Sequence, residues 1–159
     1  MVTPLGTGVS HNWSRLINGD SGISKIEEFD ASDIASRIAG TVPKTEDSPA
    51  PNGILNFSDY IEPKDMRKLD RFIAFGMIAA QEAVEDSGWE PKTQEDFERT
   101  GVMIGSGIGG LQTLYESSVT LHERGPRRIS PFALPAMLIN LISGHVSIKY
   151  GFKGPNHAT

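Results

Sequence analysis

The fold class is decided by the stretch Thr100-Gly101-Val102-Met103-Ile104-Gly105-Ser106-Gly107-Ile108-Gly109-Gly110. The apolar run from Thr100 to Gly105 predicts a short buried strand. The glycine-rich segment that follows predicts a loop, and the pattern from about 111 to 123 predicts a helix. A strand, a loop and a helix in direct succession favour an α/β protein.

The same glycines fit a G-x-G-x-x-G spacing, which in dinucleotide-binding proteins holds a pyrophosphate at a helix N-terminus. Such a unit requires a second strand that ends in an acidic residue roughly 20 residues further on. Here residues 123–131 are basic and interrupted by proline. The pattern therefore disfavours a dinucleotide site. The glycines are better interpreted as allowing close backbone packing or a bend at an interface.

Outward from this stretch, helical patterns occur on both sides. A helix is predicted from Val9 to Asn18, and a second begins at Pro63 and ends at Gly88. Residues 20–60 are irregular, with a surface loop at about 41–58, and a turn is expected after Gly151, around His157. A third helix is predicted from Ala136 to Tyr150, with these residues buried: Met137, Leu138, Leu141, Ile142, Val146 and Ile148.

Composition excludes several classes of protein. Fifteen Lys and Arg stand against 20 Asp and Glu, a net charge of −5, which argues against general nucleic-acid binding. The chain has no cysteine, so a disulfide framework, a thiolate zinc site and a cysteine nucleophile are excluded within it. No apolar run approaches the about 20 residues of a membrane span, and the first residues do not form a signal peptide. We expect a cytoplasmic protein.

No catalytic or metal-binding constellation is evident. The four histidines do not pair at metal-ligand spacing, and no serine lies in a G-x-S-x-G motif. His145 and His157 are interpreted as structural residues rather than bases. We therefore predict no catalytic residue and no metal ligand in this chain.

Two basic clusters stand out in an acidic chain: Lys64, Arg67 and Lys68, and then Arg124, Arg127 and Arg128. The first cluster lies at the predicted start of a helix, where cations are disfavoured, so it has no local explanation. Solvated surface charge and recognition of an anionic partner both remain open from the residues alone. Nucleic acid is the less favoured anion, because no aromatic residues alternate with these charges.

Several motifs, in this order and spacing, resemble a known family. Two are highly specific: Gly125-Pro126-Arg127-Arg128-Ile129-Ser130-Pro131-Phe132 and Tyr150-Gly151-Phe152-Lys153-Gly154-Pro155-Asn156. Trp13-Ser14-Arg15-Leu16, Gly19-Asp20-Ser21-Gly22-Ile23 and Arg99-Thr100-Gly101-Val102 with the glycine loop add to them. Together they resemble the N-terminal part of the type II 3-oxoacyl-[acyl-carrier-protein] synthases, which are ketosynthases of the thiolase superfamily.

The resemblance implies a fold and an activity. It implies the incomplete N-terminal half of a thiolase-like, layered αβαβα fold, helix-rich here, with residues 1–159 forming part of one ketosynthase domain. The family elongates fatty acyl chains by decarboxylative Claisen condensation of an acyl-cysteine intermediate with malonyl carrier protein, without a cofactor. The first strand, the catalytic cysteine, the histidines and the lysine are expected outside this chain, which would then be an inactive fragment of an acyltransferase.

The resemblance also implies roles for residues that are present. Ile108, Phe132 and Ala133 would line the distal end of the acyl pocket, and Ala133 in place of a frequent Phe would make that pocket roomier. Docking of the acyl carrier protein would fall to Lys64, Arg67, Lys68, Arg127 and Arg128. The complete enzyme would be a homodimer. The alternative is a non-catalytic carrier-binding or dimerisation module.

Overall fold

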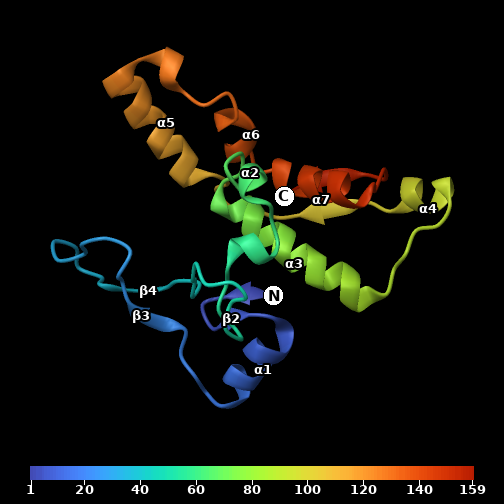
Figure 1. Cartoon of the computed structure of the whole chain (residues 1–159), viewed down its shortest axis with the longest axis horizontal. Coiled ribbons are helices and arrows are strands. Elements are labelled where there is room, and N and C mark those ends of the chain that lie inside the picture. The colour runs from blue at the N-terminus through green and yellow to red at the C-terminus, as the bar shows by residue number, and fades with distance from the viewer. The chain divides into compact units, whose positions relative to one another are not determined.

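A computed structural model describes all residues from Met1 to Thr159, which form two compact units, Met1–Tyr60 and Ile61–Thr159 (Figure 1). None of the helices combines the length and the apolar character needed to cross a membrane.

The first unit is built on a small hairpin and one helix. Strands β1 (Val2–Thr3) and β2 (Gly6–Thr7) pair antiparallel, and α1 (Val9–Ile17) follows at once. The buried Asn12 side chain donates hydrogen bonds to the carbonyls of Gly6 (3.0 Å) and Gly8 (2.8 Å), so it ties the helix to the hairpin. The helix predicted from Val9 to Asn18 is thereby confirmed.

The rest of this unit is more ordered than its sequence predicts. Strands β3 (Ile23–Lys25) and β4 (Ile38–Gly40) pair antiparallel within the segment expected to be irregular. Near its end comes the 3₁₀ helix η1 (Phe57–Asp59), which Asn56 caps by accepting from the Ser58 amide. Leu55, inside the expected surface loop, is fully buried.

The second unit carries most of the helices and a parallel strand pair. Strand β5 (Val102–Ile104) pairs with β6 (Asn156–Ala158), Met103 lying opposite His157. His157 is thus in a strand and not in the predicted turn. The helices are α2 (Pro63–Met66), α3 (Arg71–Ser87), α4 (Gln94–Arg99), α5 (Leu111–Arg124), η2 (Pro126–Arg128), α6 (Ala133–Met137) and α7 (Leu141–Tyr150).

The core of this unit lies between α3, α7 and β5. Val102, Val146 and Phe152 form its centre, and Ile73 and Ile142 are also buried. Apolar burial of this kind contributes about 25 cal/mol per Å² and is the main stabilising contribution to the unit.

Two predicted helices are each divided in two. The helix expected from Pro63 to Gly88 breaks at Asp70, whose extended backbone (φ −77°, ψ 158°) and side chain cap α3. The helix expected from Ala136 breaks at Leu138, also extended (φ −73°, ψ 132°). Leu138 and Ile148 were predicted to be buried, but they are 42% and 80% exposed. The helix end at Gly88 is confirmed, since Gly88 adopts the left-handed conformation that suits glycine.

Candidate functional site

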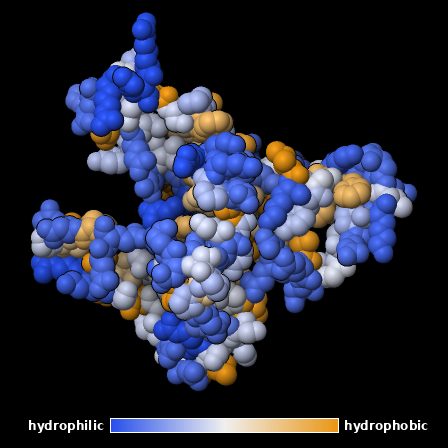
Figure 2. Space-filling view, in the orientation of Figure 1, coloured by the Kyte–Doolittle hydropathy of each residue, from blue (hydrophilic) through white to orange (hydrophobic).

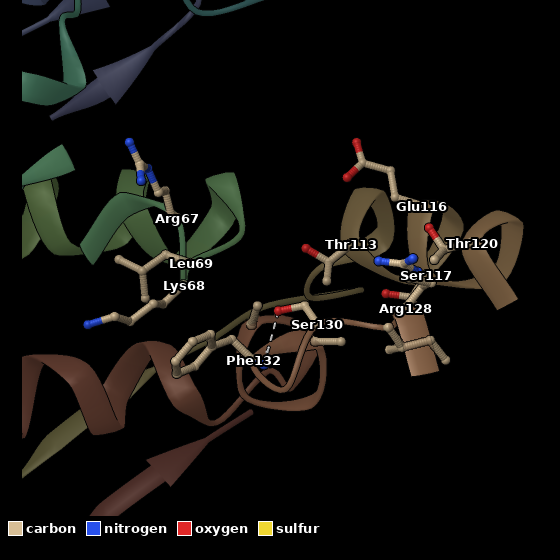
Figure 3. Close-up of a pocket in the computed structure, with 13 residues that line it drawn as sticks. Arg67, Lys68, Leu69, Thr113, Glu116, Ser117, Thr120, Arg128, Ser130 and Phe132 are labelled. Atoms are coloured by element: carbon tan, nitrogen blue, oxygen red, sulfur yellow. Dashed lines mark hydrogen bonds between the residues drawn. The ribbon is translucent and has the colours of Figure 1, made fainter. Parts of the chain in front are cut away.

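The unit Ile61–Thr159 contains a cavity of about 280 Å³ that collects residues from distant parts of the chain (Figure 3). The segment after α2, one face of α5, the end of η2 with the turn after it, and helix α6 each contribute to its wall. Its lining consists of Arg67, Lys68, Leu69, Thr113, Glu116, Ser117, Thr120, Arg128, Ile129, Ser130, Phe132, Ala133 and Ala136.

Five of the eight predicted site residues meet at this cavity: Arg67, Lys68, Arg128, Phe132 and Ala133. They come from both basic clusters and from the pair Phe132 and Ala133, which is expected to line the end of the acyl pocket. Figure 3 shows Lys68 with Phe132 toward one end and Arg128 toward the end formed by α5. The cavity therefore brings together two basic clusters that lie about 60 residues apart in the sequence and places an apolar pair beside them.

The other three predicted residues lie outside the cavity lining. Lys64 and Arg127 are exposed, and each lies within three residues of a lining residue in the sequence. Ile108 is 72% exposed in the glycine loop. Ala133, which is buried, also borders a second, more apolar hollow of about 310 Å³ with Leu134 and Met137.

Lys68 has local partners that the sequence did not suggest. Its ammonium group lies 2.8 Å from Asp65 Oδ1 and 5.8 Å from the centre of the Phe132 ring. The ion pair with Asp65 gives Lys68 a local explanation that the sequence analysis did not find. Lys64 lies on the one-turn helix α2, whereas Arg67 and Lys68 lie between α2 and α3. The hydrogen bond from Lys68 also lowers the pKa of Asp65.

A buried carboxylate joins the two sides of the cavity. Asp70 is 8% exposed, and its Oδ1 accepts a hydrogen bond from the amide of Phe72 (3.3 Å) at the start of α3. Its Oδ2 accepts from both the amide (2.9 Å) and the hydroxyl (2.7 Å) of Thr113 in α5. Sequence reasoning missed Asp70 as a site residue, although an acid placed directly before a helix is a recognisable N-cap signal.

The glycine loop meets the backbone of α6. The amide of Gly110 donates to the carbonyl of Met137 at 3.0 Å. A Cβ atom at Gly109, where φ is +79°, would lie 2.5 Å from that carbonyl oxygen, and one at Gly110 would lie 2.7 Å from Met137 Cα. The interpretation that these glycines allow close backbone packing is confirmed.

The four histidines lie on four different elements, α1, α5, α7 and β6. His145 is half-buried on α7, and burial lowers its pKa while the nearby Asp65 charge opposes that shift. His157 is exposed in β6. No three of the His, Asp and Glu side chains gather closely enough to hold a metal ion.

Large apolar side chains remain exposed along the glycine loop and α5. Figure 2 shows hydrophobic residues at the surface among hydrophilic ones. The exposed set here comprises Ile108, Leu111, Leu114, Tyr115 and Leu121. Exposed apolar surface of this kind is typical of interaction sites.

Comparison with solved structures identifies the fold. The ishigamide ketosynthase/chain length factor aligns over 99% of this chain and 37% of its own, with a TM-score of 0.75 at 20% identity. A beta-ketoacyl synthase from Burkholderia phymatum aligns over 99% and 36%, with a TM-score of 0.70 at 20% identity. The ketosynthase of a type II polyketide complex with its acyl-carrier protein, bound to a hexaketide, aligns over 66% and 29%, with a TM-score of 0.58 at 25% identity. The expected α/β, thiolase-like ketosynthase fold is confirmed.

Comparison with curated proteins gives the same family. A 3-oxoacyl-[acyl-carrier-protein] synthase 2 of Rhizobium meliloti is 47% identical over 158 residues, which is 99% of this chain and 37% of that protein. The enzyme of the same name from Vibrio harveyi is 41% identical (99% and 35%), and the mitochondrial 3-oxoacyl-[acyl-carrier-protein] synthase of Arabidopsis thaliana is 40% identical (99% and 36%). The chain thus spans just over a third of the length of these relatives.

The model of one protein family, described as the N-terminal domain of beta-ketoacyl synthase, matches residues 1–159, the full chain. Together with the fold and the identities above, this match extends over every element from β1 to β6. The chain therefore belongs to the beta-ketoacyl synthase family and corresponds to its N-terminal domain.

Proposed function

We propose that the complete protein is a 3-oxoacyl-[acyl-carrier-protein] synthase, an acyltransferase that elongates fatty acyl chains by decarboxylative Claisen condensation with malonyl carrier protein. Relatives that bear this name are 36–47% identical to the chain. In this proposal the thiolate that carries the acyl group, and the groups that decarboxylate malonate, lie outside residues 1–159. These residues supply the carrier-docking surface and one end of the acyl pocket, and the reaction takes no cofactor.

The observation that carries the proposal is the meeting of cations and an apolar pair at one cavity. Arg67, Lys68 and Arg128 line the cavity together with Phe132 and Ala133. A carrier protein that delivers an acyl chain is acidic on its docking surface and brings an apolar cargo. Both kinds of contact are therefore needed within a short distance of each other.

Docking requires the cation cluster rather than any single member. Lys64, Arg67, Arg127 and Arg128 are exposed, and an exposed ion pair contributes about 0.2–1 kcal/mol. Five such contacts, with Lys68, would add up to a useful affinity and would steer the encounter with an acidic partner. This accounts for local positive charge in a chain whose net charge is −5.

The apolar end of the site is assigned to Ile108, Phe132 and Ala133. Ala133 is buried against the cavity, whereas Ile108 is 72% exposed. A second copy of the protein would cover Ile108 and the exposed apolar residues of α5, and we therefore propose a homodimer. A cytoplasmic location is proposed from the likeness to the bacterial 3-oxoacyl-[acyl-carrier-protein] synthases.

The test is charge reversal in the complete protein. Arg127→Glu combined with Arg128→Glu is expected to raise the KM for carrier-bound substrate about tenfold, because two favourable contacts become repulsive. A small acyl thioester without the carrier should keep its KM. Arg99→Glu is the matched control, since Arg99 is exposed on α4 and pairs only with Glu95.

The outcomes separate the proposal from its rivals. Equal losses with both substrates would argue against docking by these arginines. Carrier binding without condensation by the parent protein would favour a non-catalytic carrier-binding module instead. Absence of both binding and condensation would reject the proposed function.

A further inference from the structure

The two basic clusters are carried by elements that belong to different packing groups. Helix α3, which follows the first cluster, packs mainly on α7. Helix α5, which leads to the second cluster, packs mainly on α6 and η2. The contact between α6 and α7 and the approach of Lys68 to Phe132 connect the two groups, and a further connection joins α5 to the start of α3.

Asp70 supplies that connection. Its carboxylate receives two hydrogen bonds from Thr113, a residue 43 positions further along the chain, at 2.9 Å and 2.7 Å. Hydrogen bonds to a charged acceptor are stronger than those between neutral groups. Removing them from a buried carboxylate leaves that group without partners and destabilises the fold. The close approach of Gly110, whose added Cβ would lie 3.0 Å from Asp70 Oδ2, leaves little room for another arrangement.

The position of Asp70 in the chain links it to the cations. Arg67 and Lys68 precede it by three and two residues, and both line the cavity. Thr113 also lines the cavity, on the helix that leads to Arg128. The Asp70–Thr113 contact therefore connects the segment that carries Arg67 and Lys68 to the helix that leads to Arg128.

We infer that Asp70, through Thr113, is a positioning residue that holds Arg67 and Lys68 at a fixed spacing from Arg128, so that a rigid acidic partner meets both clusters at once. This inference rests on the proposed carrier-docking function. A fixed spacing between the clusters matters because the weak contacts of both clusters add to the affinity in full only under one condition. Once the first cluster has bound, the second must bind without a further loss of conformational entropy. Asp70 is assigned no contact with the partner itself.

The experiment removes the hydroxyl bond from Thr113 to Asp70 in the complete protein, which leaves the amide bond from Thr113 and the α3 cap in place. Thr113→Val deletes the hydroxyl with little change of shape, whereas Thr113→Ser retains it and should restore the parent behaviour. Ser118→Ala is the matched control, because its hydroxyl on the same helix bonds only to the Leu114 carbonyl at 2.8 Å. Thr113→Val is expected to raise the KM for carrier-bound substrate about fivefold and to change the KM for a carrier-free thioester much less.

Two results would overturn the inference: equal losses with both substrates, or an unchanged carrier KM in Thr113→Val. Hydrogen exchange of the backbone amides in the same proteins tests the connection between Asp70 and Thr113 without an activity assay. Thr113→Val should speed exchange in residues 64–70, Thr113→Ser should not, and unchanged exchange in Thr113→Val would again overturn it. Should the parent itself fail to use the carrier, the proposed function fails, and hydrogen exchange still tests the connection.

Discussion

The ammonium group of Lys68 lies 5.8 Å from the centre of the Phe132 ring, so a residue assigned to docking contacts a residue assigned to the acyl pocket. A cation at this position over an aromatic face contributes about 0.5–1 kcal/mol at a partly exposed site. The same group pairs with Asp65, which fixes its position from the other side. In the proposed function, carrier docking and acyl-chain binding would therefore meet at the contact between Lys68 and Phe132.

Lys68→Met is expected to raise the pKa of Asp65 toward its ordinary value of 3.8, because the hydrogen bond from Lys68 is the largest cause that lowers it. In the parent, the pairing stabilises the folded state above that value and is lost as the pH falls through the lowered pKa. Titration of the Asp65 carboxyl by NMR measures the change. Lys64→Met, which removes only a weaker charge effect, should produce a smaller rise.

His145→Gln is expected to flatten the pH dependence of stability. Burial lowers the pKa of His145, so the unfolded chain takes up a proton before the folded chain does. Stability is thus complete above the ordinary pKa of 6.5 and falls as the pH drops through 6.5 to the lowered value. Denaturant unfolding between about pH 8 and pH 5 tests this. An equal pH slope in parent and variant would contradict the assignment.

Gly76→Ala is expected to destabilise the protein by about 1–3 kcal/mol, because the added methyl would overpack the contact between α3 and α7. A Cβ at Gly76 would lie 1.9 Å from Cδ1 of Ile142, which is only 4% exposed and has little space to move. Gly144→Ala in α7 is the matched control, since its nearest neighbour would be Leu141 Cδ1 at 4.0 Å. That change should be neutral or stabilising by up to about 1 kcal/mol. In thermal unfolding, Gly76→Ala should lower the Tm of the protein, whereas Gly144→Ala should leave the Tm unchanged or raise it.

Ala133→Phe in the complete protein is expected to reduce turnover of long acyl chains more than that of short ones. Ala133 is buried between two hollows of about 280 and 310 Å³, and a phenyl ring there would occupy much of that space. Steady-state kinetics over a series of acyl lengths is the measurement. Ala136→Ser, a small change at another buried residue of the same wall, serves as control. The same length preference in parent and Ala133→Phe would exclude a role in the acyl pocket.

Local patterns predicted the helices that end or begin at strong signals. Helices α1 and α5 start and stop within one residue of expectation, and β5 lies inside the predicted strand. The breaks at Asp70 and Leu138 were not predicted, because the apolar stripe continues through both positions. The hydrogen bonds between Asp70 and Thr113 help to stabilise the break at Asp70. These residues are far apart in the sequence, so a local pattern could not predict their contact.

Tertiary pairing explains the remaining differences. Strand β6 is short and polar and exists because it pairs with β5. The Asn156 side chain adds bonds to Ser143 and Ser147 of α7, which hold the strand against that helix. For the candidate site, the residue types were predictable, but their meeting at one cavity depends on α5 starting beside Asp70 and on the chain returning along α5 through η2 to α6. Ile108, in the glycine loop before α5, does not line that cavity.

The contact between the glycine loop and Met137 has a consequence for how the loop can vary. At Gly109 and Gly110 the nearest opposing atoms are main-chain atoms of Met137, so the exchange of a neighbouring side chain alone cannot make room for a substitution. Gly107 has open space around it and an ordinary backbone conformation. A library of variants selected for folding should therefore keep positions 109 and 110 as glycine, while position 107 accepts many residues.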